Sequence, residues 1–208
     1  EWIHEAAAES YIPLLDRLNK LQDRGVRNCL TIGLTPILLE QLADEDVQRN
    51  FVAYLDEKIR AAGADISRFE KASEPHMAYL ASFYCEWYRR IKDHFINQYN
   101  GNLVSAFRQL QDNDGFATAS RSAGTGYLPL LDRDESINLQ LRTAVESYHR
   151  HMGRDPRAIW LPECAYRPGY LADDGRERPG LEVLLARLRL KLFFTETHMI
   201  EGGRPVGV

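Results

Sequence analysis

The segment around Glu163 carries the residue types best suited to catalysis in this chain. A short apolar run, Ala158–Leu161, predicts a buried strand, and Pro162 and Glu163 follow it directly. Proline fixes the backbone and ends sheet pairing, so we expect Glu163 at the rim of a sheet, on a stiff stem. A carboxylate in that setting could take part in catalysis, or it could cap a neighbouring helix or pair with Arg167. The residues by themselves do not decide between these alternatives.

Two other groups near predicted strand ends could do chemistry. Cys164 could be a nucleophile, but no histidine lies near it in the sequence, and we expect a small buried residue instead. His198 lies between Glu196 and Glu201, where it could act as a base, bind a ligand or be structural. The six histidines and three cysteines have no metal-ligand spacing, so we predict no metal site.

The elements that would position these residues alternate between strands and helices. Strands are predicted at 28–34, 115–120, 158–161 and 191–195. Helices are predicted at 2–24 with a kink at Pro13, 35–42 with Thr35 as cap, 44–62, 67–98 with a boundary at Pro75, 102–111, 135–152 and 181–188. This alternation predicts a parallel sheet with helical crossovers, whose sites gather at the carboxyl ends of the strands. The segments that should form the site are therefore 35–36, 121–127, 162–166 and 196–203.

Aromatic side chains recur at helical spacing between Tyr79 and Tyr99. They could form a platform on which sugars stack, but their period favours a helix that packs against the body of the protein. The helices between the first two strands are longer than a crossover needs, which predicts a helical subdomain outside the sheet.

Composition argues against several classes of function. Lys plus Arg is 26 and Asp plus Glu is 30, a formal net charge of -4 over 208 residues, so nucleic acid is not an expected partner. No apolar run reaches the ~20 residues that cross a bilayer, and the first residues do not resemble a signal peptide. Three scattered cysteines fit a reducing cytoplasm. The chain does not begin with Met, and we expect it to be part of a larger protein.

Five segments, in the same order, resemble the α-glucan-active enzymes of glycoside hydrolase family 57, and most closely their 1,4-α-glucan branching enzymes. The most specific is Trp160–Tyr166 (WLPECAY), which is similar to the family's third motif. Each of the others is weaker by itself, but their shared order argues against chance agreement; they are 1–6 with 11–15, 35–42, 126–131 and 197–203.

This resemblance implies an α/β fold that is part of a distorted (β/α)7 barrel. Residues 1–208 would be an incomplete catalytic domain, with a helical insertion at about 44–112 on its outside. The implied reaction is retaining glycosyl transfer that cleaves α-1,4 links and makes α-1,6 branches. Glu163 would be the catalytic nucleophile, and a second carboxyl about 5–5.5 Å away the acid/base. The resemblance implies no metal or organic cofactor. The partner would be an α-glucan, bound by Trp2, Tyr127, Trp160, Tyr166 and His198.

The chain also departs from the family pattern. The family's His-rich first motif would precede Glu1, and its acid/base aspartate would follow Val208. Thr125 stands where the second motif has a histidine, and the 121–126 loop is one residue shorter. These departures keep open a noncatalytic α-glucan-binding module on a degenerate barrel, beside a 4-α-glucanotransferase or an α-amylase of the same family. The sequence does not indicate an oligomeric state.

Overall fold

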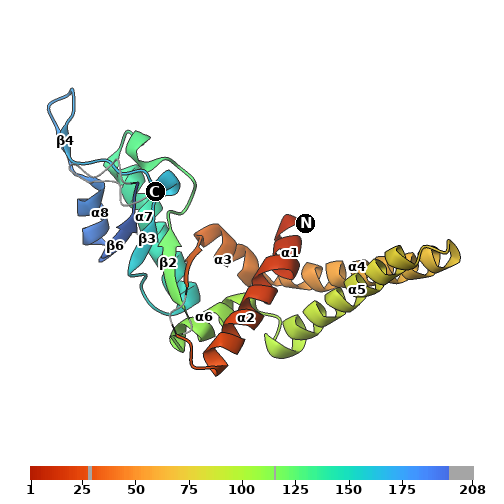
Figure 1. Ribbon diagram of the computed structural model, residues 1–208. Coiled ribbons are helices and arrows are strands. Elements are labelled where there is room, and N and C mark those ends of the chain that lie inside the picture. Colours follow the sequence, from red (N-terminus) through yellow and green to blue (C-terminus); the bar gives the residue numbers. More distant parts are fainter. Residues whose placement is uncertain (28–29, 115, 197–208) are drawn as a thin grey trace, which may run out of the picture. The chain divides into compact units, whose positions relative to one another are not determined.

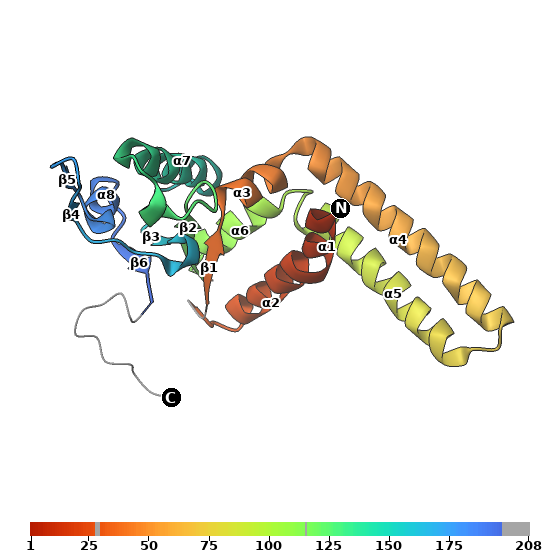
Figure 2. The same ribbon diagram turned by 90° about the horizontal axis from the view of Figure 1, so that it is seen from above.

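The computed structural model describes residues 1–27, 30–114 and 116–196 (Figures 1 and 2). The chain divides into two compact units, a helical unit of residues 1–27 and 41–115 and a sheet unit of residues 28–40 and 116–208. The predicted organisation, a single barrel domain with an insertion at about 44–112, stays a prediction. No helix within the described ranges is long and apolar enough to cross a membrane.

The helical unit begins with three helical segments that follow one another without a break. They are α1 (Trp2–Ala6), a π-helical turn (Ala7–Tyr11) and α2 (Ile12–Asp23). The wide π turn lies just before Pro13, which cannot donate the backbone hydrogen bond of a regular helix. The irregularity predicted at Pro13 is therefore confirmed. The helix stops at Gly25, whose φ of 81° suits glycine.

The rest of this unit is α4 (Glu45–Lys71), α5 (Pro75–Asp93), a second π turn (His94–Gln98) and α6 (Leu103–Asp112). α4 and α5 lie side by side as a long hairpin (Figure 2). The boundary predicted at Pro75 is confirmed, but α4 extends beyond the predicted end at Ala62. Both α4 and α6 begin at a polar cap, because the side chains of Asp44 and Asn102 accept backbone N–H groups at 2.9 Å.

The aromatic stripe that begins on α5 and continues past the π turn is only partly buried. Phe95 and Tyr99, which follow α5, belong to the core, whereas Tyr79, Phe83 and Tyr84 on α5 are exposed. The expectation that the stripe packs against the body of the protein is therefore wrong for its first half.

The sheet unit is built on four parallel strands in the order β1-β2-β3-β6, as the alternation predicted. The strands are β1 (Thr31–Leu34), β2 (Ala117–Arg121), β3 (Ala158–Trp160) and β6 (Leu192–Phe194). α3 (Pro36–Ala43) follows β1, and the Thr35 hydroxyl caps it by accepting the Leu38 N–H at 3.1 Å. α7 (Asp134–Met152) and α8 (Leu181–Arg187) are the crossovers between the later strands. A short antiparallel pair, β4 (Tyr170–Leu171) and β5 (Glu177–Arg178), was not predicted.

The strand register divides the side chains of the sheet into rows on opposite faces. One set of partners across the sheet, which we call the buried row, is Leu34, Ser120, Ile159 and Phe193. Ile159 and Phe193 pack into a core with α7 and α8 that includes Ile137, Leu141, Leu181 and Leu184. The next partners toward the carboxyl edge, Arg121, Trp160 and Phe194, lie on the other face because successive side chains alternate. We call them the open row.

Candidate active site

A pocket of about 230 Å³ lies at the carboxyl edge of the first three strands of the sheet unit. It is formed by the segments that follow β1, β2 and β3, as expected for a parallel sheet. Its lining residues are Thr35, Ile37, Arg121, Ser122, Ala123, Gly124, Thr125, Pro162 and Glu163. Glu163 is the one carboxylate among these described lining residues, so a carboxylate-based reaction here would depend on it.

Glu163 lies in an unusual turn immediately after β3. Pro162–Cys164 form a single 3-10 turn in which Glu163 and Cys164 each have a φ of 52°. Such left-handed backbone costs about 1–3 kcal/mol for a residue other than glycine, and surrounding contacts must hold it. Three hydrogen bonds of 3.0 Å do so: Cys164 N–H to the Leu161 carbonyl, Ala165 N–H to the Pro162 carbonyl, and the Thr195 hydroxyl to the Cys164 carbonyl.

Glu163 is exposed and lines the pocket. It has no hydrogen bond or ion pair with any residue that the structure describes. Arg167 instead pairs with Asp134, at 3.5 Å between Nη2 and Oδ1. The alternatives in which Glu163 caps a helix or pairs with Arg167 are therefore wrong. Cys164, expected to be buried, is half-buried.

The loop after β2 brings Thr125 into the same pocket. Gln140 of α7 anchors this loop, because its side-chain oxygen accepts the Gly124 N–H at 2.8 Å and its backbone carbonyl accepts the Ala123 N–H at 3.2 Å. The Ser122 hydroxyl donates to the Gly124 carbonyl at 2.5 Å and tightens the turn. Thr125, the position at which this chain differs from the family's second motif, is therefore part of the pocket lining.

Trp160 and Tyr166, expected to bind substrate, lie on either side of the Glu163 turn. Trp160 belongs to the open row, is 40% exposed, and stacks on Phe194 with ring centroids 4.7 Å apart. Tyr166 stacks on Phe193 of the buried row, and its hydroxyl donates to Glu182 at 2.7 Å. Burial, together with this carboxylate, raises the pKa of Tyr166 to about 12. Tyr166 therefore already has a structural partner, and its substrate role stays a prediction.

The other expected substrate-binding residues have no described contact with the pocket. Tyr127 follows the pocket loop and is partly exposed. Trp2 belongs to the helical unit and is 86% exposed. His198 lies outside the residues that the structure describes. Their roles in binding glucan stay predictions.

The segments 35–36 and 121–127, which the sequence predicted for the site, contribute Thr35 and Arg121 to the pocket, although neither residue was given a role. Thr195 was not predicted for the site. It follows β6 and supports the Glu163 turn from 31 positions beyond Cys164, which no local pattern indicates. Across the described part of the chain, no three His, Cys, Asp or Glu side chains gather in a way that could hold a metal ion.

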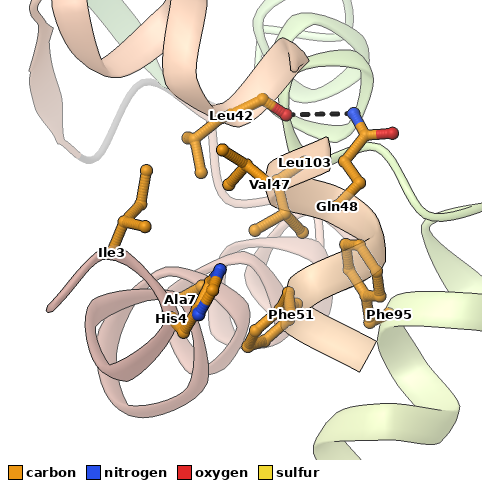
Figure 3. A pocket seen from close by; sticks show the side chains of 9 residues that line it. All are labelled: Ile3, His4, Ala7, Leu42, Val47, Gln48, Phe51, Phe95 and Leu103. Atoms are coloured by element: carbon orange, nitrogen blue, oxygen red, sulfur yellow. Dashed lines mark hydrogen bonds between the residues drawn. The ribbon is translucent and has the colours of Figure 1, made fainter. Parts of the chain in front are cut away.

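The helical unit contains a second, much smaller hollow (Figure 3). Its volume is about 10 Å³, room for no more than one water molecule. His4, Phe51 and Phe95 line it, and the Gln48 amide donates to the Leu42 carbonyl at 3.0 Å (Figure 3). Burial lowers the pKa of His4, which favours its neutral form. This hollow is part of the packing of the unit and has no room for a substrate.

Comparison with known proteins identifies the class of protein. The model of glycosyl hydrolase family 57 matches residues 1–203, and the chain belongs to this family. A 1,4-alpha-glucan branching enzyme of Thermococcus kodakarensis is 39% identical over 98% of this chain and 30% of its own length. A probable 1,4-alpha-glucan branching enzyme of Mycobacterium tuberculosis is 26% identical over the whole chain and 40% of its own length.

Solved structures agree with this assignment. A family 57 branching enzyme from Pyrococcus horikoshii superposes with a TM-score of 0.84 at 41% identity, over 97% of this chain and 38% of that one. The alpha-amylase AmyC from Thermotoga maritima gives a TM-score of 0.80 at 30% identity, over 95% of this chain and 35% of that one. The four parallel strands are thus a portion of the (β/α)7 barrel of this family. The chain spans about a third of the length of these relatives.

Proposed function

We propose that the protein is a 1,4-α-glucan branching enzyme that works by retaining glycosyl transfer, and that Glu163 is its nucleophile. The observation that carries this proposal is the exposed, unpaired Glu163 carboxylate, presented to a pocket by a strained turn. The names of the relatives at 39% and 41% identity support the substrate and the reaction. The proposed partner is an α-glucan.

The reaction follows from the chemistry of two carboxyl groups. A carboxylate oxygen of Glu163 attacks the anomeric carbon of an α-1,4-linked glucose as the bond to the leaving oxygen breaks. A second carboxyl group protonates that oxygen and then takes a proton from the 6-hydroxyl of an acceptor glucan. The acceptor oxygen attacks the anomeric carbon and displaces Glu163, which leaves an α-1,6 branch. Since relatives are about three times as long, we propose that the second carboxyl belongs to the part of the protein outside this chain. We also propose that residues 1–208 form part of the catalytic barrel domain and that residues at about 44–112 are its helical insertion.

The test is the Glu163→Gln variant of the complete protein, which keeps the shape of the side chain but removes its nucleophilic charge. Amylose is incubated with either protein, and the loss of iodine staining and the number of new 1,6 links are measured. We expect the variant to lose activity by more than about 1,000-fold, because the covalent step needs a carboxylate. Activity close to that of the unsubstituted protein would refute the assignment of Glu163.

Two observations favour alternatives that the same experiment separates. The similarity to AmyC favours hydrolysis, which would release reducing ends without 1,6 links; a 4-α-glucanotransferase would give new 1,4 links only. Thr125, which replaces a histidine in the pocket lining, favours a noncatalytic module. In that case the unsubstituted protein would bind glycogen without turnover.

A further inference from the structure

Arg121 holds a distinctive position in the sheet unit. It is the last residue of β2, and its register partner on β3 is Trp160 of the open row. Adjacent residues on paired strands point to the same face, so Arg121 shares the face on which Trp160 stacks against Phe194. Arg121 also lines the pocket together with Glu163.

A glycine on the neighbouring strand makes room for the stem of Arg121. Gly33 pairs with Ala119, two residues before Arg121, so the two positions are diagonal neighbours on one face. The Cγ and Cδ atoms of Arg121 lie 3.9 Å from the place where a Cβ on Gly33 would be. The aliphatic part of the Arg121 side chain therefore lies over the backbone of Gly33 in β1. Thr35, which lines the pocket, follows two residues later.

The donors of the Arg121 guanidinium are not used by described residues of the protein. It has no hydrogen bond or ion pair with any residue in the described ranges, whereas Arg178 of the same unit donates to Asp134 at 2.9 Å. A guanidinium carries five N–H donors. The hydroxyls of the lining are neutral and weaker donors, and that of Ser122 is already used, because it donates to the Gly124 carbonyl. Arg121 is therefore the strongest donor in the pocket that remains available for a ligand.

We propose that Arg121 is a substrate-binding residue that donates hydrogen bonds to hydroxyl groups of the glucan unit next to Glu163. This inference rests on the proposed function and names a residue that sets substrate affinity. A neutral polyol fits the pocket better than an anion does, because the Glu163 carboxylate would repel a phosphate or carboxylate that approached Arg121. The planar donor fork can hold two adjacent hydroxyls at once.

The test measures binding separately from turnover. In the complete protein with Glu163→Gln, the affinity for maltoheptaose is determined by calorimetry with and without Arg121→Met, which keeps the stem over Gly33 but removes the donors. We expect about tenfold weaker binding, the effect of losing hydrogen bonds from a charged group. Arg121→Lys should restore part of the affinity through its charge. Arg142→Met, on the exposed face of α7, is the matched control and should leave affinity unchanged.

The outcomes separate this inference from the proposed function. If Glu163→Gln is inactive but Arg121→Met binds maltoheptaose as tightly as its parent, Arg121 does not bind substrate and the inference fails alone. If Glu163→Gln stays fully active, the proposed nucleophile fails, whatever Arg121 does. Inorganic phosphate that binds through Arg121 more tightly than maltoheptaose does would overturn the choice of a neutral sugar. Circular dichroism and the melting temperature of each variant show that it is folded.

Discussion

The buried row and the open row are neighbours on the same strands, yet their side chains differ in kind. The buried row joins Leu34, Ile159 and Phe193 through Ser120, whose hydroxyl donates to a backbone carbonyl of its own strand at 3.2 Å. The open row begins with Arg121 and ends with two stacked aromatic rings. The buried row thus contains apolar side chains and one serine whose hydroxyl has a partner. The open row contains side chains that are available to bind a ligand.

Because of this difference, residues that stabilise the fold and residues that could bind a ligand alternate along the same strand. Ile159 is fully buried, and the next residue, Trp160, is 40% exposed. Since successive side chains alternate between faces, one strand can serve the core with one residue and a ligand with the next. We infer that the buried row stabilises the sheet unit and that substitutions in the open row have a much smaller effect on the free energy of unfolding.

The largest expected effect tests that contrast directly. Ile159→Ala removes a fully buried side chain between the sheet and the crossover helices, and should lower the free energy of unfolding by about 3 kcal/mol. Leu192→Ala lies on the opposite face, is 55% exposed, and should cost less than about 1 kcal/mol. Urea denaturation of both variants measures the difference. Equal losses would show that the open face is also a packed interface in the complete protein.

A second prediction concerns the link between β6 and the Glu163 turn. Thr195→Val removes the 3.0 Å hydrogen bond to the Cys164 carbonyl but keeps the shape of the side chain. Without it the left-handed turn is less firmly held, and the Glu163 carboxylate should leave its productive position part of the time. We expect kcat to fall about tenfold with KM nearly unchanged, because the group that moves acts in the chemical step.

Controls can distinguish positioning from a general loss of structure. Thr195→Ser keeps the hydroxyl and should restore most of kcat. Thr143→Val makes the same substitution at an exposed site on α7 and should change neither kcat nor melting temperature. If Thr195→Val raised KM and left kcat intact, the hydrogen bond would serve substrate binding and not the position of Glu163.

Local chemistry explains which parts of this fold the sequence could predict. The Thr35 cap, the boundary at Pro75 and the stop at Gly153, with its φ of 73°, each depend on one residue type at one position. The parallel order of the strands followed from their alternation with helices. The position of Glu163 at the strand edge followed from Pro162 and the apolar run before it.

The features that escaped prediction depend on partners far along the chain or on very short elements. The β4–β5 pair has only two residues in each strand, too few for a period to be recognised. Half of the aromatic stripe is exposed, although its helical spacing suggested that it packs against the body of the protein. Spacing predicts a helix, but it does not tell whether another element covers the aromatic face. The positive φ of Glu163 is not encoded by its residue type, and no local pattern indicates that the Arg121 side chain has no hydrogen bond or ion pair within the described residues.

The smallest expected effect concerns how α7, which covers the buried row, is tied to α3. Burial alone would raise the pKa of Glu40, but the hydrogen bond from Ser147, at 2.7 Å, and the nearby His151 and Arg150 side chains outweigh it and lower that pKa. A lowered folded-state pKa stabilises the fold above the unfolded value, and the stabilisation disappears as pH falls through the folded value. Ser147→Ala should therefore destabilise the protein at about pH 7 and much less at about pH 3. The difference should stay below about 1 kcal/mol, because the Glu40 side chain is 45% exposed. Thermal unfolding at both pH values measures it, with Ser136→Ala at the exposed start of α7 as control; a loss that does not depend on pH would assign Ser147 to packing alone.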